Sequence, residues 1–258
     1  MSIKLKSRRE IELMRSAGSI VAEVLLQLKE VAVPGISTGE LNRIALQMTK
    51  KAGAEALFLG VKSPYAKMAF PGVICASIND EVVHGIPSDQ VKLSEGDILS
   101  IDFGVRLAGY CGDSAITVGI GEISSQRHRL IEVTSEVLQI AVSKAGPGKK
   151  WSQVAGPMQR YAEAAGFSVV EDFVGHGIGR EMHEEPRVPN FVGAELLAND
   201  FVLTEGMVLA VEPMINAGSC EVKTLKNGWT VVTKDGKSSA HFEHTIAITD
   251  NGCEVLTV

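Results

Sequence analysis

One ten-residue pattern occurs twice in this chain, as Leu93-Ser-Glu-Gly-Asp-Ile-Leu-Ser-Ile-Asp102 and as Leu203-Thr-Glu-Gly-Met-Val-Leu-Ala-Val-Glu212. After a shared Glu-Gly pair, each copy continues as a nearly uninterrupted apolar run and ends in an acid. Such runs are typical of strands that are buried on both faces. The pattern therefore predicts two related buried strands, each with a carboxylate at its end.

Shorter matches in the same order extend this repeat over most of the chain. They pair Pro34-Gly35 with Pro147-Gly148, Ala52-Gly53 with Ala165-Gly166, and His84-Gly-Ile86 with His176-Gly-Ile178. No linker-like or low-complexity segment separates the two halves. We therefore predict a single domain over residues 1–258, built from a pseudo-twofold duplicated α/β unit whose copies cover roughly residues 10–120 and 125–258.

Local patterns predict two helices followed by strands in each half. Apolar residues three and four positions apart predict helices that include Ile11–Leu28 and Leu130–Ala141, and the second helix of each half ends near an Ala-Gly pair. Ser7-Arg-Arg-Glu10 is a capping box for the first helix. The expected strands are Val73–Ser77, Asp97–Phe103, Ala115–Val118, Phe167–Val170, Met207–Val211, Trp229–Thr233, Phe242–Thr249 and a last strand after the turn at Asp250-Asn-Gly252.

The bulk composition is that of a globular protein with one substantial core. The chain has 258 residues, of which 45% are hydrophobic, and its formal net charge of −6 argues against a basic surface for nucleic acid. We interpret the basic N-terminal residues as a solvated tail, because no apolar signal-peptide region follows Lys4, Lys6, Arg8 and Arg9. No apolar stretch is long enough to cross a bilayer, and the four scattered cysteines are typical of reduced thiols. These features predict a cytoplasmic protein.

Carboxylates at the ends of apolar strands need an explanation. Burying Asp102 or Glu212 alone is costly, so each needs a partner or a metal ion, unless its strand end turns toward solvent. Two further acids, Asp113 at the start of a strand and Glu243 within one, weaken the solvent explanation. His176 lies in a glycine-rich loop that a bound group can approach closely, although a lone loop histidine is more often a surface residue.

Together these four carboxylates and one histidine form an oxygen-rich ligand set. Such a set suits two divalent ions a few ångströms apart with bridging carboxylates, an arrangement that lowers the pKa of a shared water and polarises a carbonyl group. Zinc-finger sulfur ligation is absent from the pattern, and a calcium cage would not need the histidine. The residues therefore favour a two-metal hydrolytic centre whose ions could be Mn, Fe, Co or Zn.

Four motifs carry a resemblance to a known family. They are Ser77-Ile-Asn-Asp-Glu-Val-Val-His-Gly-Ile-Pro87, Gly175-His-Gly-Ile-Gly-Arg-Glu-Met-His-Glu-Glu-Pro186, Val211-Glu-Pro-Met214 and Phe242-Glu-His-Thr245. In this order they resemble the type I methionine aminopeptidases, whose pita-bread fold is shared with prolidase and creatinase, and the resemblance runs essentially end to end. It implies an α/β (α+β) fold around a central, mostly antiparallel sheet.

The resemblance also implies roles for individual residues. The metal ligands it implies are Asp102, Asp113, His176, Glu212 and Glu243. Glu212 would also shuttle a proton from the attacking water, His183 would contact the substrate carbonyl, and His84 would assist protonation of the scissile amide nitrogen. Without the motifs, two loop histidines hydrogen-bonded to the backbone would be the simpler interpretation of His84 and His183.

A small apolar cup is implied for the methionine side chain. The positions that match it are Phe70, Cys75, Met182 and Trp229, for which ordinary core packing is the commoner role. The implied activity is removal of the initiator methionine when the second residue is small, by metal-activated water at a site with two divalent ions. The implied partners are N-termini of nascent polypeptides, encountered at the ribosome, and we expect a monomer that binds neither nucleic acid nor membrane.

Two segments depart from the family pattern, and two other functions stay open. Leu57–Met68 differs from related segments, and His241 stands where some members have glutamine. An X-Pro aminopeptidase would share the five ligands, although the separate N-terminal domain typical of prolidases is not expected here. A non-catalytic binding protein with this fold would be expected to have lost ligands, and all five are present.

Overall fold

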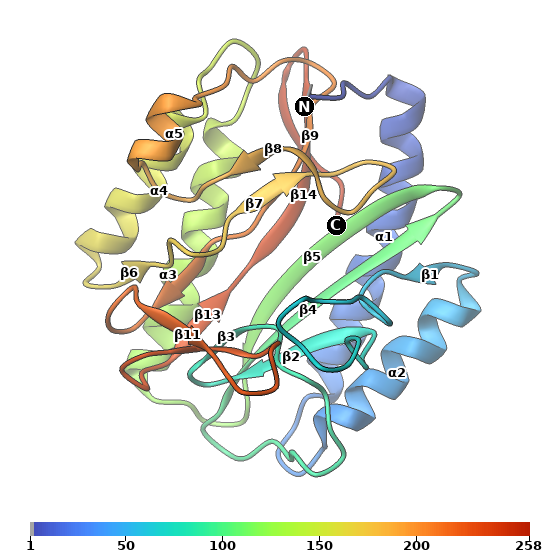
Figure 1. The fold of residues 1–258 in the computed structure, drawn as a ribbon, viewed down its shortest axis with the longest axis vertical. Coiled ribbons are helices and arrows are strands. Elements are labelled where there is room, and N and C mark those ends of the chain that lie inside the picture. The colour runs from blue at the N-terminus through green and yellow to red at the C-terminus, as the bar shows by residue number, and fades with distance from the viewer. Residues whose placement is uncertain (1–2) are drawn as a thin grey trace.

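A nine-stranded sheet organises the protein (Figure 1). The computed structural model describes residues 3–258. The sheet runs in the order β1-β4-β5-β14-β9-β7-β8, with β2 beside β4 and β15 beside β14, and every pairing in it is antiparallel. Its strands are β1 (Glu55–Ala56), β2 (Ile74–Ile78), β4 (Ile98–Leu107), β5 (Tyr110–Gly119), β7 (Gly175–Gly177), β8 (Glu184–Val188), β9 (Val208–Val211), β14 (Glu243–Thr249) and β15 (Gly252–Val255).

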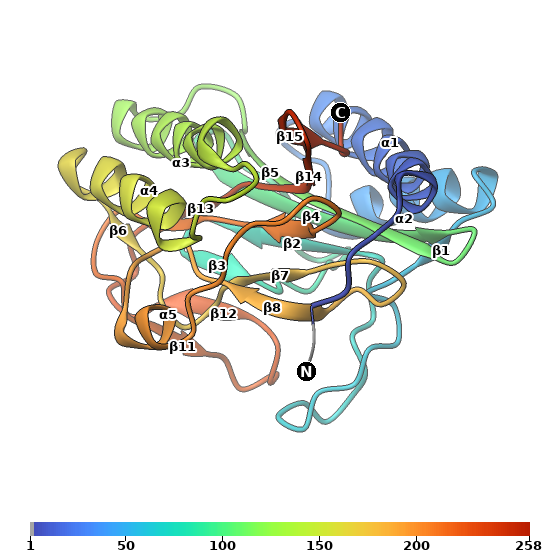
Figure 2. The ribbon, with the colours of Figure 1, turned by 90° about the horizontal axis from the view of Figure 1, so that it is seen from above.

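Long helices cover one face of this sheet, as Figure 2 shows from above. They are α1 (Arg8–Val31), α2 (Thr38–Lys51), α3 (Ser125–Lys144) and α4 (Ser152–Ala164), whereas α5 (Ala194–Ala198) is a short helix after β8. A small sheet of β11 (Val222–Thr224), β12 (Val231–Thr233) and β3 (Glu81–Val83) lies on the other side of the main sheet. A second small sheet, of β13 (Ser239–His241), β10 (Met214–Asn216) and β6 (Ser168–Val169), contacts α3 and α4.

The first helix shows how local signals and tertiary packing combine. Its predicted capping box is confirmed, since the Ser7 N–H donates to the Glu10 carboxylate at 2.9 Å and the Glu10 N–H donates to Ser7 Oγ at 3.4 Å. The helix crosses β5 very closely, because a Cβ atom on Gly112 would lie 2.7 Å from the backbone nitrogen of Gly18. The absence of a side chain at Gly112 therefore sets the distance between α1 and β5 at this crossing.

Each pair of helices covers its own hydrophobic core. Side chains of α3 and α4 pack with β6, β9 and β14, and side chains of α1 and α2 pack with β2, β4 and β5. The two halves meet where β5 pairs with β14, with Ala115 opposite Glu243. The predicted fold class is confirmed: mixed α/β content surrounds a curled antiparallel sheet. The internal duplication stays a prediction, although this arrangement suits it.

Some expectations from the sequence differ from the structure. The predicted helices are present, but β4 and β5 extend beyond the expected strands to form a hairpin of ten residue pairs. The solvated-tail interpretation is wrong for Lys6, which is buried and forms an ion pair with Glu184. In the described part of the chain, no helix has the length and apolar character needed to span a membrane.

Candidate metal centre

Five neighbouring strands of the main sheet each bring one predicted ligand into a single pocket. In sheet order, β4 carries Asp102, β5 carries Asp113, β14 carries Glu243, the end of β9 leads into Glu212, and β7 carries His176. All five side chains line a pocket of about 280 Å³. The strand order thus gathers residues that are distant in the sequence, so the structure brings the whole predicted ligand set together.

Strand pairing fixes the acids from β5 and β14 at close range. The Thr245 hydroxyl accepts a hydrogen bond from the Asp113 N–H at 3.1 Å and donates one to the Asp113 carbonyl at 2.8 Å, so it locks β5 to β14. Gly104 pairs with Asp113 across the β4–β5 hairpin, and a Cβ atom there would lie 2.9 Å from Asp113 Oδ1. The absence of a side chain at Gly104 leaves room for the Asp113 carboxylate.

His176 owes its position to the glycines on both sides of it. A Cβ atom on Gly175 would lie 2.3 Å from the Ala210 carbonyl oxygen, and one on Gly177 would lie 2.2 Å from that of Glu185. His176 Nδ1 lies 2.9 Å from the Gly177 carbonyl oxygen, which can only accept, so Nδ1 carries the proton in the neutral ring. The lone pair on Nε2 is then free on the side of the acids, and this atom lies 3.6 Å from Glu212 Oε1.

The electrostatics of the four acids fit a bound cation. Burial, then repulsion from neighbouring carboxylates, holds the pKa values of Asp113, Glu212 and Glu243 well above their usual range, and burial raises the pKa of Asp102 to about 7. Within residues 3–258, Asp102 Oδ1, Asp113 Oδ1 and Glu243 Oε1 are buried without a hydrogen-bond partner.

A divalent metal ion resolves this cluster of unpaired negative charge. Ligand atoms of Asp113, His176 and Glu243 all lie within 4.8 Å of one another, a spacing that one ion can bridge. Carboxylate oxygens and a neutral imidazole nitrogen are ligands that first-row divalent metals accept. The residues present therefore fit the metal that the sequence predicts.

The two predicted catalytic histidines lie in the same pocket. The His183 and His176 rings meet edge to face, with centroids 4.3 Å apart. His84 contacts Phe173 and Trp229 in the same manner, at 5.8 and 6.4 Å. Burial lowers the pKa of His84 to about 4 and lowers that of His183 as well, so both rings are neutral near pH 7.

His241 lies behind Glu212, outside the pocket lining. Its Nε2 atom is 3.8 Å from Glu212 Oε2, and its ring is almost fully buried. Glu212 is thus flanked by an imidazole on each side, since His176 faces its other oxygen. The sequence marks His241 only as a departure from the family pattern, and the structure shows that its neighbour is the Glu212 carboxylate.

The predicted apolar cup forms one wall of the pocket. Phe70, Cys75, Met182 and Trp229 all line it, and the Phe70 and Trp229 rings pack edge to face at 5.3 Å. The Trp229 indole N–H donates to the Met68 carbonyl at 2.9 Å, which fixes the ring against the segment between β1 and β2.

Five apolar lining residues were not predicted from the sequence. They are Phe58, Val61, Val83, Phe173 and Val174. The first two lie in the divergent segment 57–68, so that segment does form part of the pocket wall. The only sequence signal for Phe58 and Val61 was that their segment differs from related segments, because no periodic pattern marks these two residues.

Comparisons with known proteins agree with this geometry. Residues 12–250 match the description "Metallopeptidase family M24". The chain is 48% identical over 257 residues to a methionine aminopeptidase of Aquifex aeolicus, covering 100% of this chain and 99% of that protein. It is also similar to the solved structure of a methionine aminopeptidase from Thermotoga maritima, with a TM-score of 0.92, 40% identity and 99% of each chain covered.

A more distant likeness concerns the fold alone. The structure of an X-Pro aminopeptidase from Thermotoga maritima has a TM-score of 0.74 and 23% identity, and the match covers 98% of this chain but 62% of that one. The fold is therefore common to enzymes with different substrates. The substrate of this chain must therefore be inferred from the residues around the metal centre and not from the fold.

Proposed function

The chain belongs to metallopeptidase family M24, and we propose that the pocket described above is the active site with which it removes the N-terminal methionine of its substrates. The chain is a peptide hydrolase. One observation carries the assignment of the site: the apolar cup and the cluster of acids share a single pocket. A methionine side chain in the cup would place its own peptide bond beside the acids and the two histidines.

The protein binds divalent metal, and we propose that it holds two ions. Asp102, Asp113, His176, Glu212 and Glu243 would be their ligands. Divalent ions held there supply Lewis-acid polarisation of the scissile carbonyl and lower the pKa of water. Mn, Fe, Co and Zn all suit this ligand set.

The remaining chemistry belongs to side chains of the pocket. Glu212 would take a proton from the attacking water, because its carboxylate lies in the pocket beside the other proposed ligands. His183 would donate its N–H to the substrate carbonyl oxygen and stabilise the charge that develops on it. His84 would act at the amide nitrogen as a neutral imidazole that receives the proton and passes it to the leaving group.

Substrate selection would have two separate sources. Soft thioether contacts with Cys75 and Met182 and the Trp229 ring would favour an unbranched methionine side chain. Crowding beside the scissile bond, near His84 and His183, would exclude bulky second residues. We propose N-termini of nascent polypeptides in the cytoplasm, at the ribosome, as the substrates, and a monomer as the active form.

Hydrolysis of short peptides by metal-stripped and metal-restored protein tests this function. Met-Ala-Ser should be cleaved only after one kind of divalent ion is added back, and Leu-Ala-Ser should be cleaved much more slowly. Full activity in thoroughly metal-free protein would contradict the metal mechanism. Equal rates for methionine and leucine at the first position would contradict the methionine specificity and leave the metal centre intact. A panel of Pro-containing peptides whose first residue varies separates this activity from that of an X-Pro aminopeptidase, which would also cleave before proline when the first residue is not methionine.

A further inference from the structure

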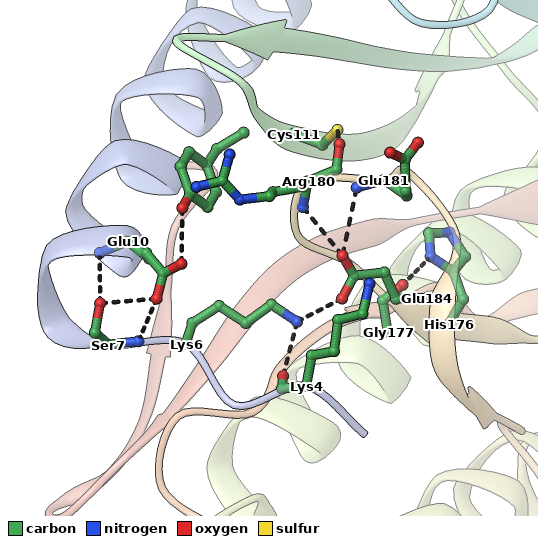
Figure 3. Close-up of polar contacts among 11 residues, drawn as sticks. Lys4, Lys6, Ser7, Glu10, Cys111, His176, Gly177, Arg180, Glu181 and Glu184 are labelled. Atoms are coloured by element: carbon green, nitrogen blue, oxygen red, sulfur yellow. Dashed lines mark hydrogen bonds and ion pairs between the residues drawn. The ribbon is translucent and has the colours of Figure 1, made fainter. Parts of the chain in front are cut away.

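The loop between β7 and β8 carries two pocket residues, Met182 and His183, yet it has no regular secondary structure. Figure 3 shows what holds it: polar contacts from two other parts of the chain converge on this loop. Such loops are usually mobile unless something fixes them. The precision of His183 therefore depends on these contacts.

The first anchor is a buried ion pair between the N-terminal segment and the end of the loop. Lys6 Nζ lies 2.8 Å from Glu184 Oε2, and the two side chains are 6% and 4% exposed. The backbone N–H of Lys6 donates to the Gly206 carbonyl at 2.7 Å, so the segment that carries the ammonium group is itself fixed. Glu184 directly follows His183 in the chain.

The same Glu184 carboxylate also closes the loop on itself. Its Oε1 atom accepts hydrogen bonds from the backbone N–H groups of Arg180, at 3.1 Å, and Glu181, at 3.4 Å. A Cβ atom on Gly179 would lie 2.6 Å from Lys6 Cε and 2.7 Å from Glu184 Oε1, so the stem of Lys6 packs directly on this glycine. One carboxylate therefore joins both ends of the loop to Lys6.

The second anchor holds the opposite side of the loop against β5. The Cys111 N–H donates to the Gly179 carbonyl at 2.8 Å, and the Arg180 guanidinium lies over the Tyr110 ring, 4.6 Å from its centroid. The Tyr110 hydroxyl donates in turn to Glu10 Oε1 at 2.7 Å, in the first turn of α1. Because β5 is fixed in the sheet, these contacts hold Gly179 and Arg180 in place. The Lys6–Glu184 pair then determines the position of the other end of the loop, next to His183.

A buried ion pair contributes little to stability, because the cost of removing two charges from water offsets most of their attraction. Its attested benefit is to favour one arrangement over others. Catalysis needs such an arrangement, since a displacement of about 1 Å can cost roughly 10²-fold in rate.

We infer that Lys6 and Glu184 are positioning residues of the active site, which clamp the loop 179–184 so that His183 and Met182 face the pocket. Neither residue touches the substrate, and both act through the loop. The N-terminal segment is then part of the catalytic apparatus. The catalytic part of this inference rests on the proposed function, whereas the structural part does not.

Kinetics and hydrogen exchange of matched variants test the clamp in the metal-loaded enzyme. The variants are Lys6→Met, Glu184→Gln and their double combination, in which no unpaired charge remains buried. The control removes the ion pair between Arg15 and Glu254, which also joins distant segments at 2.7 Å but is 34% and 50% exposed. Each variant is assayed well below its melting temperature.

We expect the clamp variants to lower kcat by roughly 10- to 100-fold, with a smaller change in KM and wild-type metal content. Backbone amides of residues 179–184 should exchange faster in the double variant, while those of β5 and β14 stay protected. The Arg15→Met and Glu254→Gln controls should leave kcat and loop exchange unchanged.

Two results would overturn the inference. A folded double variant with wild-type kcat would show that the pair does not position His183. Unchanged exchange of the loop amides would show that the pair does not hold the loop. If wild-type enzyme releases no methionine from Met-Ala-Ser, the proposed function fails, and the exchange measurement still decides whether the clamp exists.

Discussion

His84 adopts a backbone conformation that non-glycine residues rarely occupy, with φ at 59°. The next residue, Gly85, allows this turn, because a Cβ atom there would lie 2.2 Å from the Ala76 carbonyl oxygen. The turn directs the imidazole toward Phe173 and Trp229, inside the pocket. Backbone strain of this kind persists where the surrounding structure enforces it, and it is concentrated at functional sites.

Removing the His84 imidazole should therefore lower the rate and leave the metal centre intact. For His84→Asn we expect kcat to fall roughly 10²–10⁴-fold, the range for losing a proton-transfer group. Asparagine tolerates a positive φ, so this variant keeps the turn, whereas His84→Ala adds strain. Steady-state kinetics and metal analysis of both variants provide the check, and loss of metal from His84→Asn would refute the assigned role.

Trp229 should determine how strictly the cup selects methionine. Its ring packs on Phe70 and is fixed by the Met68 carbonyl, so Trp229→Ala removes a rigid wall. Apolar pockets discriminate a single methylene by about 1–3 kcal/mol, and we expect most of that preference to disappear. The measurement is kcat/KM for Met-Ala-Ser, norleucine-Ala-Ser and Leu-Ala-Ser. An unchanged ratio of methionine to leucine would show that another wall selects the side chain.

At the scale of elements, β7 shows how a strand is shaped by its neighbours. It lies between β8 and β9. The glycines on either side of His176 allow these strands to approach more closely than a side chain would permit. The strand has only three residues, so its position depends on this close packing and not on its own propensity.

Adding one methyl group to β7 should displace His176. In Gly177→Ala the new Cβ atom would meet the Glu185 carbonyl oxygen at 2.2 Å, so β7 and β8 must separate. Overpacking of this kind costs about 1–3 kcal/mol, and we expect reduced metal affinity as well. Gly146→Ala is the matched control, because its nearest contact would be at 3.7 Å. Urea unfolding and metal titration of both variants provide the measurement. If Gly177→Ala had the same stability and metal affinity as Gly146→Ala, the proposed role of the close packing at β7 would be wrong.

The sequence was sufficient for the four long helices and for the acids that line the pocket, but not for the short helix α5. The ends of α1 and α2 are marked by serine caps and by Pro34-Gly35 and Gly53, which are local signals. Asp102 and Glu212 were recognisable because they interrupt apolar strands.

Residues whose role depends on distant contacts could not be predicted in this way. Phe58 and Val61 line the pocket only because the segment between β1 and β2 folds over it. The burial of Lys6 depends on Glu184, which lies 178 positions away in the sequence but beside Lys6 in the folded protein. Neither periodicity nor composition records such contacts.

For the whole molecule, the metal centre concentrates negative charge at the middle of the fold. Helices cover one face of the sheet and support the five ligand-bearing strands from that side. Four acids meet in the pocket, and among the described residues no lysine or arginine forms an ion pair with them. The fold should consequently depend on bound cations, and the dependence should change with pH.

The direction of this dependence follows from the raised pKa values. Between about pH 4, where these acids titrate in an unfolded chain, and about pH 7, where Asp102 titrates in the fold, the metal-free protein retains protons that the unfolded chain has released. The contribution of Asp102 to the free energy of unfolding of the metal-free protein then falls as pH rises through this range. His176 acts in the opposite direction between about pH 4 and pH 6.5, because burial lowers its pKa to about 4 while the unfolded chain still binds that proton.

Thermal unfolding with and without saturating metal at pH 5 and pH 8 should reveal this effect. Between pH 5 and pH 8 the Asp102 shift corresponds to about 3 kcal/mol, so the melting temperatures of loaded and metal-free protein should differ by roughly 6–12 °C more at pH 8 than at pH 5. In Asp102→Asn, the metal-free protein should lose the part of its pH dependence that Asp102 contributes, because one titrating acid is gone while the side chain keeps its shape. A gap between loaded and metal-free protein that stays constant from pH 5 to pH 8 would mean that the four carboxylates are not held together by the cation.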